Sequence, residues 1–212
     1  MTQIEHQTLN TVVHAAFRRT LDRFDAALET FPAGSQQRAD ELVRAWDFFA
    51  HEMHDHHHYE EQFFWPALGQ TDADLSSVAE LDSEHDAMRT ALENATDSVG
   101  RLHADPTAGN AATVRTAVTT LKDVLLGHLE HEERDLEPIS VAYASTKPMK
   151  TALAQVKKTH LAKMGNFVEW LQDGATEADK AGLRREIPRP VVSLFGTLAG
   201  RRYRKEVAPV WR

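Results

Sequence analysis

An internal repeat is the feature that most constrains the fold of this chain. The stretch HHHYEEQFFWP at 56–66 aligns with HLEHEERDLEP at 128–138, with a histidine, two glutamates and a proline in register at a shift of 72 residues. Upstream, HAAFRRTL at 14–21 aligns with HDAMRTAL at 85–92 at a shift of 71 residues. Such repeats constrain the whole fold, and this one predicts two copies of a helix-pair unit.

Apolar residues recur at steps of three and four along four segments of the chain. They are Phe17, Leu21, Phe24 and Leu28; Leu42, Trp46, Phe49 and Met53; Leu81, Met88, Ala95, Val99 and Leu102; and Val114, Val118, Leu121 and Leu125. This spacing is typical of the buried face of a helix. Turn-forming residues separate the segments at 31–34, 69–72 and 105–110. The sequence therefore predicts an all-α fold, an antiparallel up-and-down four-helix bundle.

Polar residues of the repeat fill the gaps in these apolar faces. The six are His14, His56, Glu60, His85, His128 and Glu132. Residues four apart lie one turn from each other on one helix face, so each His-x-x-x-Glu brings an imidazole and a carboxylate into one small volume. A single histidine on an apolar face is more often a hydrogen-bonded core residue than a ligand. Six polar side chains in one interior indicate a metal site instead.

The chemistry of these side chains predicts which cations they hold. Two buried carboxylates close together repel each other and are costly to desolvate unless a cation is present. The chain has no cysteine, so the ligands are nitrogen and oxygen, which suit iron, manganese or zinc. Two ions with about six positions each would leave several positions for a bridge and for exogenous ligands. We therefore predict two iron ions, non-haem and oxo- or hydroxo-bridged, in preference to manganese or zinc.

The repeated blocks resemble the haemerythrin family of bacterial HHE cation-binding proteins, whose pattern is His, His-x-x-x-Glu, His, His-x-x-x-Glu/Asp on four helices. The resemblance covers about residues 1–140. It implies a non-haem di-iron centre that binds oxygen or related small ligands, held by the six residues given above. The sequence departs from oxygen-carrying members at Arg89, where they have a second histidine, and at Glu132 and Glu133, where they have one aspartate. The missing imidazole predicts an iron position that is open or filled by another ligand.

We expect a protein that binds or senses O2 or related ligands, namely NO or peroxide, at this buried site. The alternatives are a redox enzyme that decomposes hydrogen peroxide and a protein that sequesters iron; the sequence does not decide whether the chain is an enzyme. His-Glu-x-x-His and Glu-x-x-His do not occur, which argues against a zinc protease and a ferritin-type site.

Other polar residues near the repeat are given secondary positions. Surface or flanking positions are expected for His51, His54, His57, His58, His103 and His131. His57 with Glu61 is a rival register, but His56 with Glu60 keeps the apolar spacing and matches the second copy. Glu61 and Glu133 are expected to orient ligating imidazoles. For Tyr59 a buried hydrogen bond is expected.

The charge distribution divides the chain into an expected bundle at 1–144 and a helical extension at 145–212. The first part has 10 Lys and Arg against 26 Asp and Glu, and the second has 14 against 6. The acidic bundle argues against nucleic-acid binding, and the opposite charges favour a short helix at 187–211 that folds against the bundle. His160 is expected in the core or at an interface.

The ends of the chain bear on its location. The N-terminus lacks the basic start and apolar run of a signal peptide, and the apolar stretch at 190–200 is too short to cross a bilayer, so we expect a cytoplasmic protein. Arg201, Arg202, Arg204 and Lys205 beside that stretch leave membrane-surface binding as a minor hypothesis.

Overall fold

The computed structural model describes residues 7–160, 164–187 and 199–212, leaving out the side chain of His160, and this part of the chain is helical without strands. The expectation for His160 and most of the apolar stretch at 190–200 fall outside the described residues.

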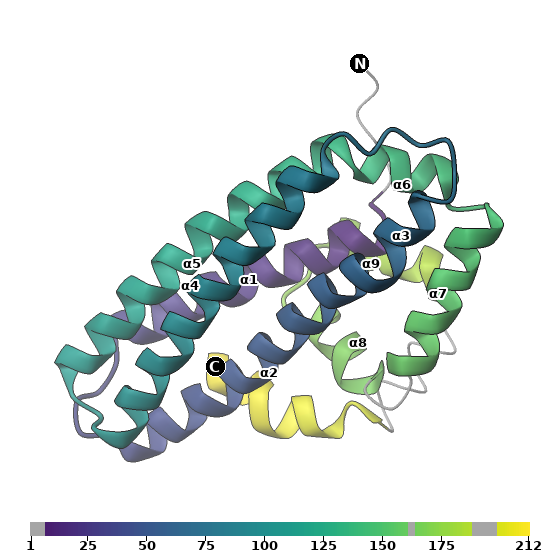
Figure 1. Cartoon of the computed structure of the whole chain (residues 1–212). Helices are drawn as coiled ribbons and strands as arrows, with labels where there is room; N and C mark the ends of the chain where they lie inside the picture. The colour runs from purple at the N-terminus through teal and green to yellow at the C-terminus, as the bar shows by residue number, and fades with distance from the viewer. Residues whose placement is uncertain (1–6, 161–163, 188–198) are drawn as a thin grey trace.

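Four long helices form an antiparallel bundle, which confirms the predicted fold. They are α1 (Leu9–Glu29), α2 (Gln36–Tyr59), α4 (Val78–Ala104) and α5 (Ala108–Asp135). Figure 1 shows them side by side along the long direction of the molecule. Helix α5 packs on α1 and on α4, and α4 also packs on α2, whereas α1 and α2 approach each other less closely. The weakest seam of the bundle is thus the one between α1 and α2.

The helices begin where the sequence supplies caps. The side chains of Thr8, Ser35 and Thr107 accept hydrogen bonds from backbone amides in the first turns of α1, α2 and α5. Between α1 and α2, Gly34 has a φ of 83°, a conformation that glycine adopts without steric cost. These local signals set the helix lengths that bring the repeated histidines level with one another.

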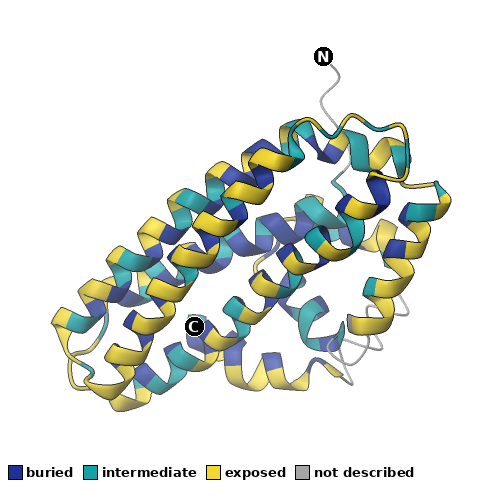
Figure 2. Cartoon of the chain, in the orientation of Figure 1, coloured by how far each residue is buried: buried dark blue, intermediate teal, exposed yellow. Residues whose placement is uncertain are grey.

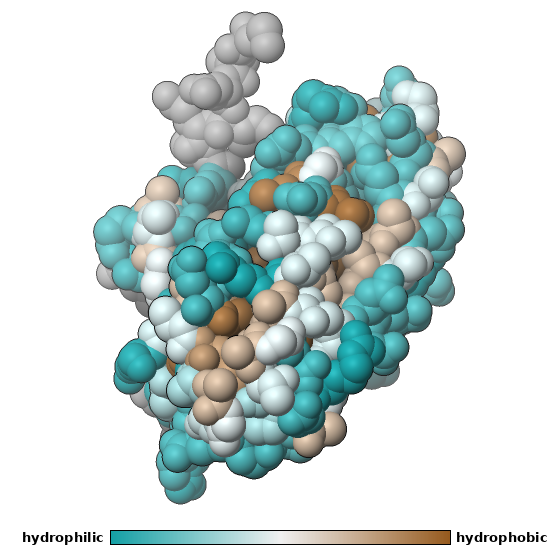
Figure 3. All heavy atoms as spheres, turned by 90° about the vertical axis from the view of Figure 1, so that its left-hand side faces the viewer, coloured by the Kyte–Doolittle hydropathy of each residue, from teal (hydrophilic) through white to brown (hydrophobic). Residues whose placement is uncertain are grey.

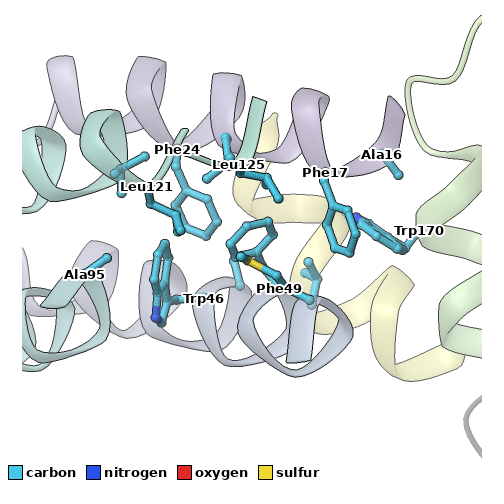
Figure 4. Packing of buried hydrophobic residues seen from close by; sticks show 14 of the residues in the cluster. Ala16, Phe17, Phe24, Trp46, Phe49, Ala95, Leu121, Leu125 and Trp170 are labelled. Carbon is cyan, nitrogen blue, oxygen red and sulfur yellow. The ribbon is translucent and has the colours of Figure 1, made fainter. Parts of the chain in front are cut away.

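The apolar faces meet in one core. Buried residues line the inward sides of the helices and exposed residues the outward sides (Figure 2). The rings of Phe17, Phe24, Trp46 and Phe49 pack between α1 and α2 (Figure 4), with edge-to-face contacts such as 6.0 Å between the centroids of Phe17 and Phe49. This core lies directly beside His56, whose ring centroid is 5.4 Å from that of Phe17.

Helix α2 does not end as an ordinary α-helix. A π-helical turn, Glu60–Phe64, continues into the short helix α3 (Trp65–Leu68). A π turn inserts extra chain into a helix and rotates the residues that follow it. After this turn Phe63 is only half-buried, and Trp65 is buried.

The remaining helices form the C-terminal part of the chain. Helix α6 (Glu137–Tyr143) leads to α7 (Lys147–His160), which packs on α3, and α8 (Met164–Gln172) and α9 (Glu177–Glu186) pack on α1. The last segment, a π turn at Tyr203–Val207 followed by a 3-10 turn at Ala208–Trp211, packs on α2.

The extension covers the seam between α1 and α2, beside α2 in Figure 1. The ring of Trp170 lies 5.2 Å from that of Phe17 on α1, and the ring of Tyr203 lies 5.2 Å from that of Phe48 on α2. The extension thus shields the core from solvent on the side where the bundle is least closed.

Ion pairs also join α1 to the C-terminal extension. Among the described residues, arginines of α1 bind aspartates of the extension: Arg19 contacts Asp179 at 3.3 Å and Arg23 contacts Asp173 at 3.0 Å. Arg202 pairs with Glu206 inside the extension itself. Apolar packing and arginines of α1 therefore hold the segment that contains α8 and α9 against the bundle.

The outer surface is mostly polar. On the face shown in Figure 3, hydrophilic residues surround a band of more apolar ones. Within the described residues, no helix has the length and apolar character needed to span a membrane.

Candidate metal centre

The structure brings all six predicted residues into the interior at one level of the bundle. Their ligand atoms fall into two groups, within each of which the atoms lie within 4.8 Å of one another. The first group contains His14, His56, Glu60 and Glu132, and the second contains His57, Glu60, His85 and His128. Glu60 belongs to both groups. The arrangement can hold two cations with one carboxylate between them.

Short contacts join the first group. Nε2 of His14 lies 3.1 Å from Nε2 of His56 and 3.2 Å from Oε2 of Glu132. Nε2 of His56 lies 3.1 Å from Oε1 of Glu60. These atoms come from α1, α2 and α5 and from the π turn, so the first group forms only when three long helices are packed together.

The second group is richer in imidazole. Nε2 of His85 lies 3.2 Å from Nε2 of His128 and 3.6 Å from Oε2 of Glu60. The ring centroid of His57 lies 4.6 Å from that of His85 and 5.3 Å from that of His128. This group has three imidazoles and one carboxylate, whereas the first has two of each.

His57 was expected at the surface, and that expectation is wrong, because only 8% of the residue is exposed. In a helix with 3.6 residues per turn, Glu60 lies about 40° around the axis from His56 and about 60° the other way from His57. The carboxylate therefore lies between the two imidazoles and can serve both groups. The pattern His-His-x-x-Glu, formed by His56, His57 and Glu60, could have indicated this arrangement from the sequence alone. His57 also places a third imidazole in the second group, where it could take the place of the histidine that Arg89 replaces.

Carboxylates behind the ligands fix the imidazole rings. Nδ1 of His14 donates to Oε1 of Glu133 at 2.9 Å, and Nδ1 of His85 donates to Oε1 of Glu61 at 2.7 Å. Both carboxylates were expected in this role. Such hydrogen bonds set which ring nitrogen is free to bind a cation.

Glu84 plays the same part for His128 and was not anticipated. Its Oε2 accepts from Nδ1 of His128 at 2.9 Å, and its Oε1 accepts from Nδ1 of His131 at 2.8 Å. His131 is 9% exposed, so its expected surface position is wrong, whereas His54 and His103 are exposed as expected. Glu84 and His131 also form a third group with the exposed Glu80. Because both oxygens of Glu84 already accept hydrogen bonds, this group has fewer free donors than the first two.

The orientation of the rings shows that the second group suits a cation. Nδ1 of His85 and Nδ1 of His128 both face carboxylates, which can only accept, so both must carry hydrogen. A neutral imidazole has one hydrogen, and each Nε2 is therefore a lone pair. The two lone pairs face each other at 3.2 Å. Two acceptors at this distance need a positive species between them.

Buried atoms without partners support the same conclusion. Among the described residues, both carboxylate oxygens of Glu60, Oε2 of Glu132 and Nε2 of His57 are buried and make no hydrogen bond of good geometry, although imidazole nitrogens lie 3.1–3.6 Å from these carboxylate oxygens. Unpaired buried carboxylate oxygens are costly. Coordination of a cation would satisfy all of them, so the residues present fit a metal pair.

The pKa values describe where protons lie when no cation is bound. Burial acts to lower the pKa of His14, but hydrogen bonds and charge from Glu132 and Glu133 raise it to about 9. Burial acts to raise the pKa of Glu132, yet contact with His14 lowers it to about 2. Burial, followed by the charge of Glu132, raises the pKa of Glu60 well above its usual range. A cation entering the centre must therefore displace protons.

Apolar rings enclose the centre. Trp65 stacks on His85 with 4.8 Å between ring centroids, and Phe17 contacts His56 and His57. Tyr59 is 8% exposed, and its hydroxyl bonds Asp55 at 3.4 Å. This agrees with the hydrogen bond expected for Tyr59 and places its hydroxyl on a residue outside both ligand groups.

Fold and site together define a helical-bundle protein with a buried histidine and glutamate centre for cations. Comparison with known families agrees: the model described as "Hemerythrin HHE cation binding domain" matches residues 11–140. The chain belongs to this haemerythrin HHE family, as the repeated blocks predicted. No curated protein and no solved structure matched the chain.

Proposed function

We propose that this protein holds two iron ions and binds or senses O2 or a related small ligand, such as NO or peroxide. The observation that carries the proposal is the pair of imidazole lone pairs of His85 and His128 facing each other at 3.2 Å. They lie beside a carboxylate, Glu60, that also reaches the other group. A ferrous pair bound here would supply electrons and open coordination positions for a small ligand.

The ligand count supports a reactive centre. Two imidazoles and two carboxylates in one group, and three imidazoles and one carboxylate in the other, leave positions free on ions that accept about six ligands. Nitrogen and oxygen donors without thiolate suit iron. The chain's own residues thus hold the ions without saturating them.

The walls of the centre determine what reaches it. Phe17 is fully buried and Trp65 is 7% exposed, so apolar rings exclude bulk water from beside His56, His57 and His85. An apolar surrounding favours small neutral molecules over larger or charged ones. This supports O2, NO or peroxide as ligands.

The test begins with the number of ions per chain, measured by elemental analysis of protein purified from its native host. The iron-loaded protein is then reduced without air, exposed to O2 and followed by absorption. A spectrum that appears with O2 and reverses under vacuum supports the proposal. Rapid irreversible oxidation, or protein without metal after incubation with ferrous salt, contradicts it.

A second measurement separates binding from turnover. Peroxide is added to the loaded protein and to a His56→Ala variant, and O2 evolution is recorded. Evolution that exceeds the rate of free iron and disappears in the variant would identify an enzyme and overturn the binding assignment.

A further inference from the structure

Two arginines occupy equivalent places behind the centre. Arg18 follows His14 by four residues on α1, and Arg89 follows His85 by four residues on α4, so each lies one turn from a ligand on its own helix. Arg18 and Arg89 are also in register in the repeat.

Arg18 binds the carboxylate that orients His14. Its Nη1 and Nη2 donate to Oε1 and Oε2 of Glu133 at 2.7 and 3.2 Å. Oε1 of Glu133 also accepts from Nδ1 of His14. Two parallel hydrogen bonds from a guanidinium fix both the position and the plane of a carboxylate. The ring of His14 is thereby tied to α1 through a residue of α5.

Arg89 makes the corresponding series of hydrogen bonds behind His85, on the other side of the centre. Its Nη1 donates to Oε1 of Glu61 at 2.9 Å, the same oxygen that accepts from Nδ1 of His85. Its Nη2 bonds Asp86, so the guanidinium is held at both ends. In both series, the glutamate that the arginine binds directly follows a candidate ligand glutamate in the sequence. That pair of glutamates belongs to the copy of the repeat that does not contain the oriented histidine.

Two other pairs show what is particular about these arginines. Glu84, which orients His128, has His131 in place of an arginine. Arg115 binds Asp25 at 2.7 Å and joins α5 to α1 as Arg18 does, but touches no ligand histidine. An arginine can therefore join α1 and α5 without lying behind a ligand histidine, so joining helices does not explain the positions of Arg18 and Arg89.

We propose that Arg18 and Arg89 are positioning residues that lock the ring orientation and the tautomer of His14 and His85 for cation binding, each acting on a different ion. The inference rests on the proposed metal centre and deepens it.

The physical reason lies in the two tautomers of imidazole. With hydrogen on Nδ1, the Nε2 lone pair points into the centre; with hydrogen on Nε2, the ring cannot bind a cation there. A carboxylate held in place by an arginine selects the first tautomer. Without the arginine the glutamate can turn toward solvent, since Glu133 and Glu61 have 29% and 22% of their side chains exposed. Loss of such supporting bonds commonly weakens metal binding about 10- to 100-fold.

The experiment compares Arg18→Gln and Arg89→Gln with Arg115→Gln as the matched control. Ferrous ion affinity is measured without air by competition with a coloured chelator, at each of the two binding steps. We expect each of the first two variants to weaken one of the two ions about 10- to 100-fold. Arg115→Gln should bind both ions as the unmodified protein does.

A second readout separates positioning from simple stabilisation. In the protein loaded with Co2+, proton NMR resolves the shifted Nδ1 hydrogens of ligand histidines. Arg18→Gln should speed solvent exchange of one such hydrogen, and Arg89→Gln of another, with no change in the control. Arg18→Lys and Arg89→Lys keep the charge without the paired geometry and should weaken the same ions by a smaller factor.

The outcomes are distinguishable. Unchanged affinity and exchange in folded variants would overturn the positioning role while leaving the metal centre intact. Equal weakening in the control would also overturn it, because helix cross-linking would then explain the effect. If the unmodified protein binds neither Fe2+ nor Co2+, the proposed function fails together with this inference.

Discussion

Replacement of Glu60 by glutamine should change the stability of the metal-free and metal-loaded protein in opposite directions. Glu60 is the one residue common to both ligand groups, and only 5% of it is exposed. Its two oxygens lie 3.1 and 3.6 Å from Nε2 of His56 and Nε2 of His85 but make no hydrogen bond of good geometry among the described residues. Without a cation, its carboxyl group is costly because it is buried beside Glu132. With two cations bound, it holds both.

The expected changes in stability follow from the cost of Glu60 without a cation and from its binding of cations. Each pH unit between the ordinary pKa of Glu60 and its raised pKa costs about 1.4 kcal/mol of stability, so removal of the titrating group by Glu60→Gln should stabilise the metal-free protein by about 1–3 kcal/mol at neutral pH. A ligand present at a hundred times its dissociation constant contributes about 2.7 kcal/mol, so two ions contribute about 5 kcal/mol in the unmodified protein. For 212 residues the unfolding entropy is about 0.45 kcal/mol per kelvin. These energies correspond to about 2–7 °C and about 12 °C in melting temperature.

The gain in the metal-free protein should depend on pH. The folded structure raises the pKa of Glu60, first by burial and then by the charge of Glu132. Between the ordinary pKa and the raised one, the folded protein binds more protons than the unfolded chain, so its stability falls as pH rises. Glu60→Gln removes this loss. The difference in stability between the metal-free variant and the metal-free unmodified protein should be small below a pH of about 4.5 and should grow above it.

The assay is calorimetric melting of metal-free and ferrous-loaded protein, without air, at several pH values. Glu93→Gln, the same chemical change at an exposed position of α4, is the control and should melt as the unmodified protein does. Two results would refute the reasoning. One is a melting temperature of metal-free Glu60→Gln protein below that of the metal-free unmodified protein. The other is a rise in melting temperature on iron loading that is as large in Glu60→Gln as in the unmodified protein.

Three further predictions follow from the same contacts. His57→Leu copies Leu129, the equivalent residue of the repeat, and should weaken one of the two ions on the order of 10-fold or more in chelator competition; full retention of both would exclude His57 as a ligand. Burial raises the pKa of Glu137, so Glu137→Gln should raise the urea midpoint of the metal-free protein at neutral pH and not below about pH 4.5; an equal shift at both would contradict this. A Cβ at Gly165 would lie 2.4 Å from the backbone of Ala199, so Gly165→Ala should destabilise the docked extension by about 1–3 kcal/mol in thermal melts. Gly100→Ala, with nothing within 4 Å, should not destabilise, and equal melts of the two variants would show that the close approach is unimportant.

The long helices and most of the centre could be predicted because the signals are local and repeated. Steps of three and four placed Phe17, Trp46 and Phe49 in the core, where they are buried. The repeat placed histidines and glutamates in the same interior without knowledge of helix contacts. Only the assumption that each helix presents a single inward face was needed.

That assumption failed at the π turn and at His57. Two adjacent histidines lie about 100° apart around a helix, so a single inward face admits only one of them. Both are used because the centre holds two groups, one on each side of Glu60. Glu84 could not be predicted for another reason: its contact with His128 depends on how α4 and α5 are aligned, which no local pattern specifies.

The repeat also explains why the two proposed ions would differ. Each group takes residues from both copies, as Glu132 of the second copy joins His14 and His56 of the first. Neither helix pair could thus hold an ion by itself. The symmetry breaks at one place, where His57 corresponds to Leu129, which is fully buried. One group then has three imidazoles and one carboxylate and the other has two of each, so two cations bound here would have different ligands. The two positions are therefore inequivalent in the chain itself, before any exogenous ligand binds.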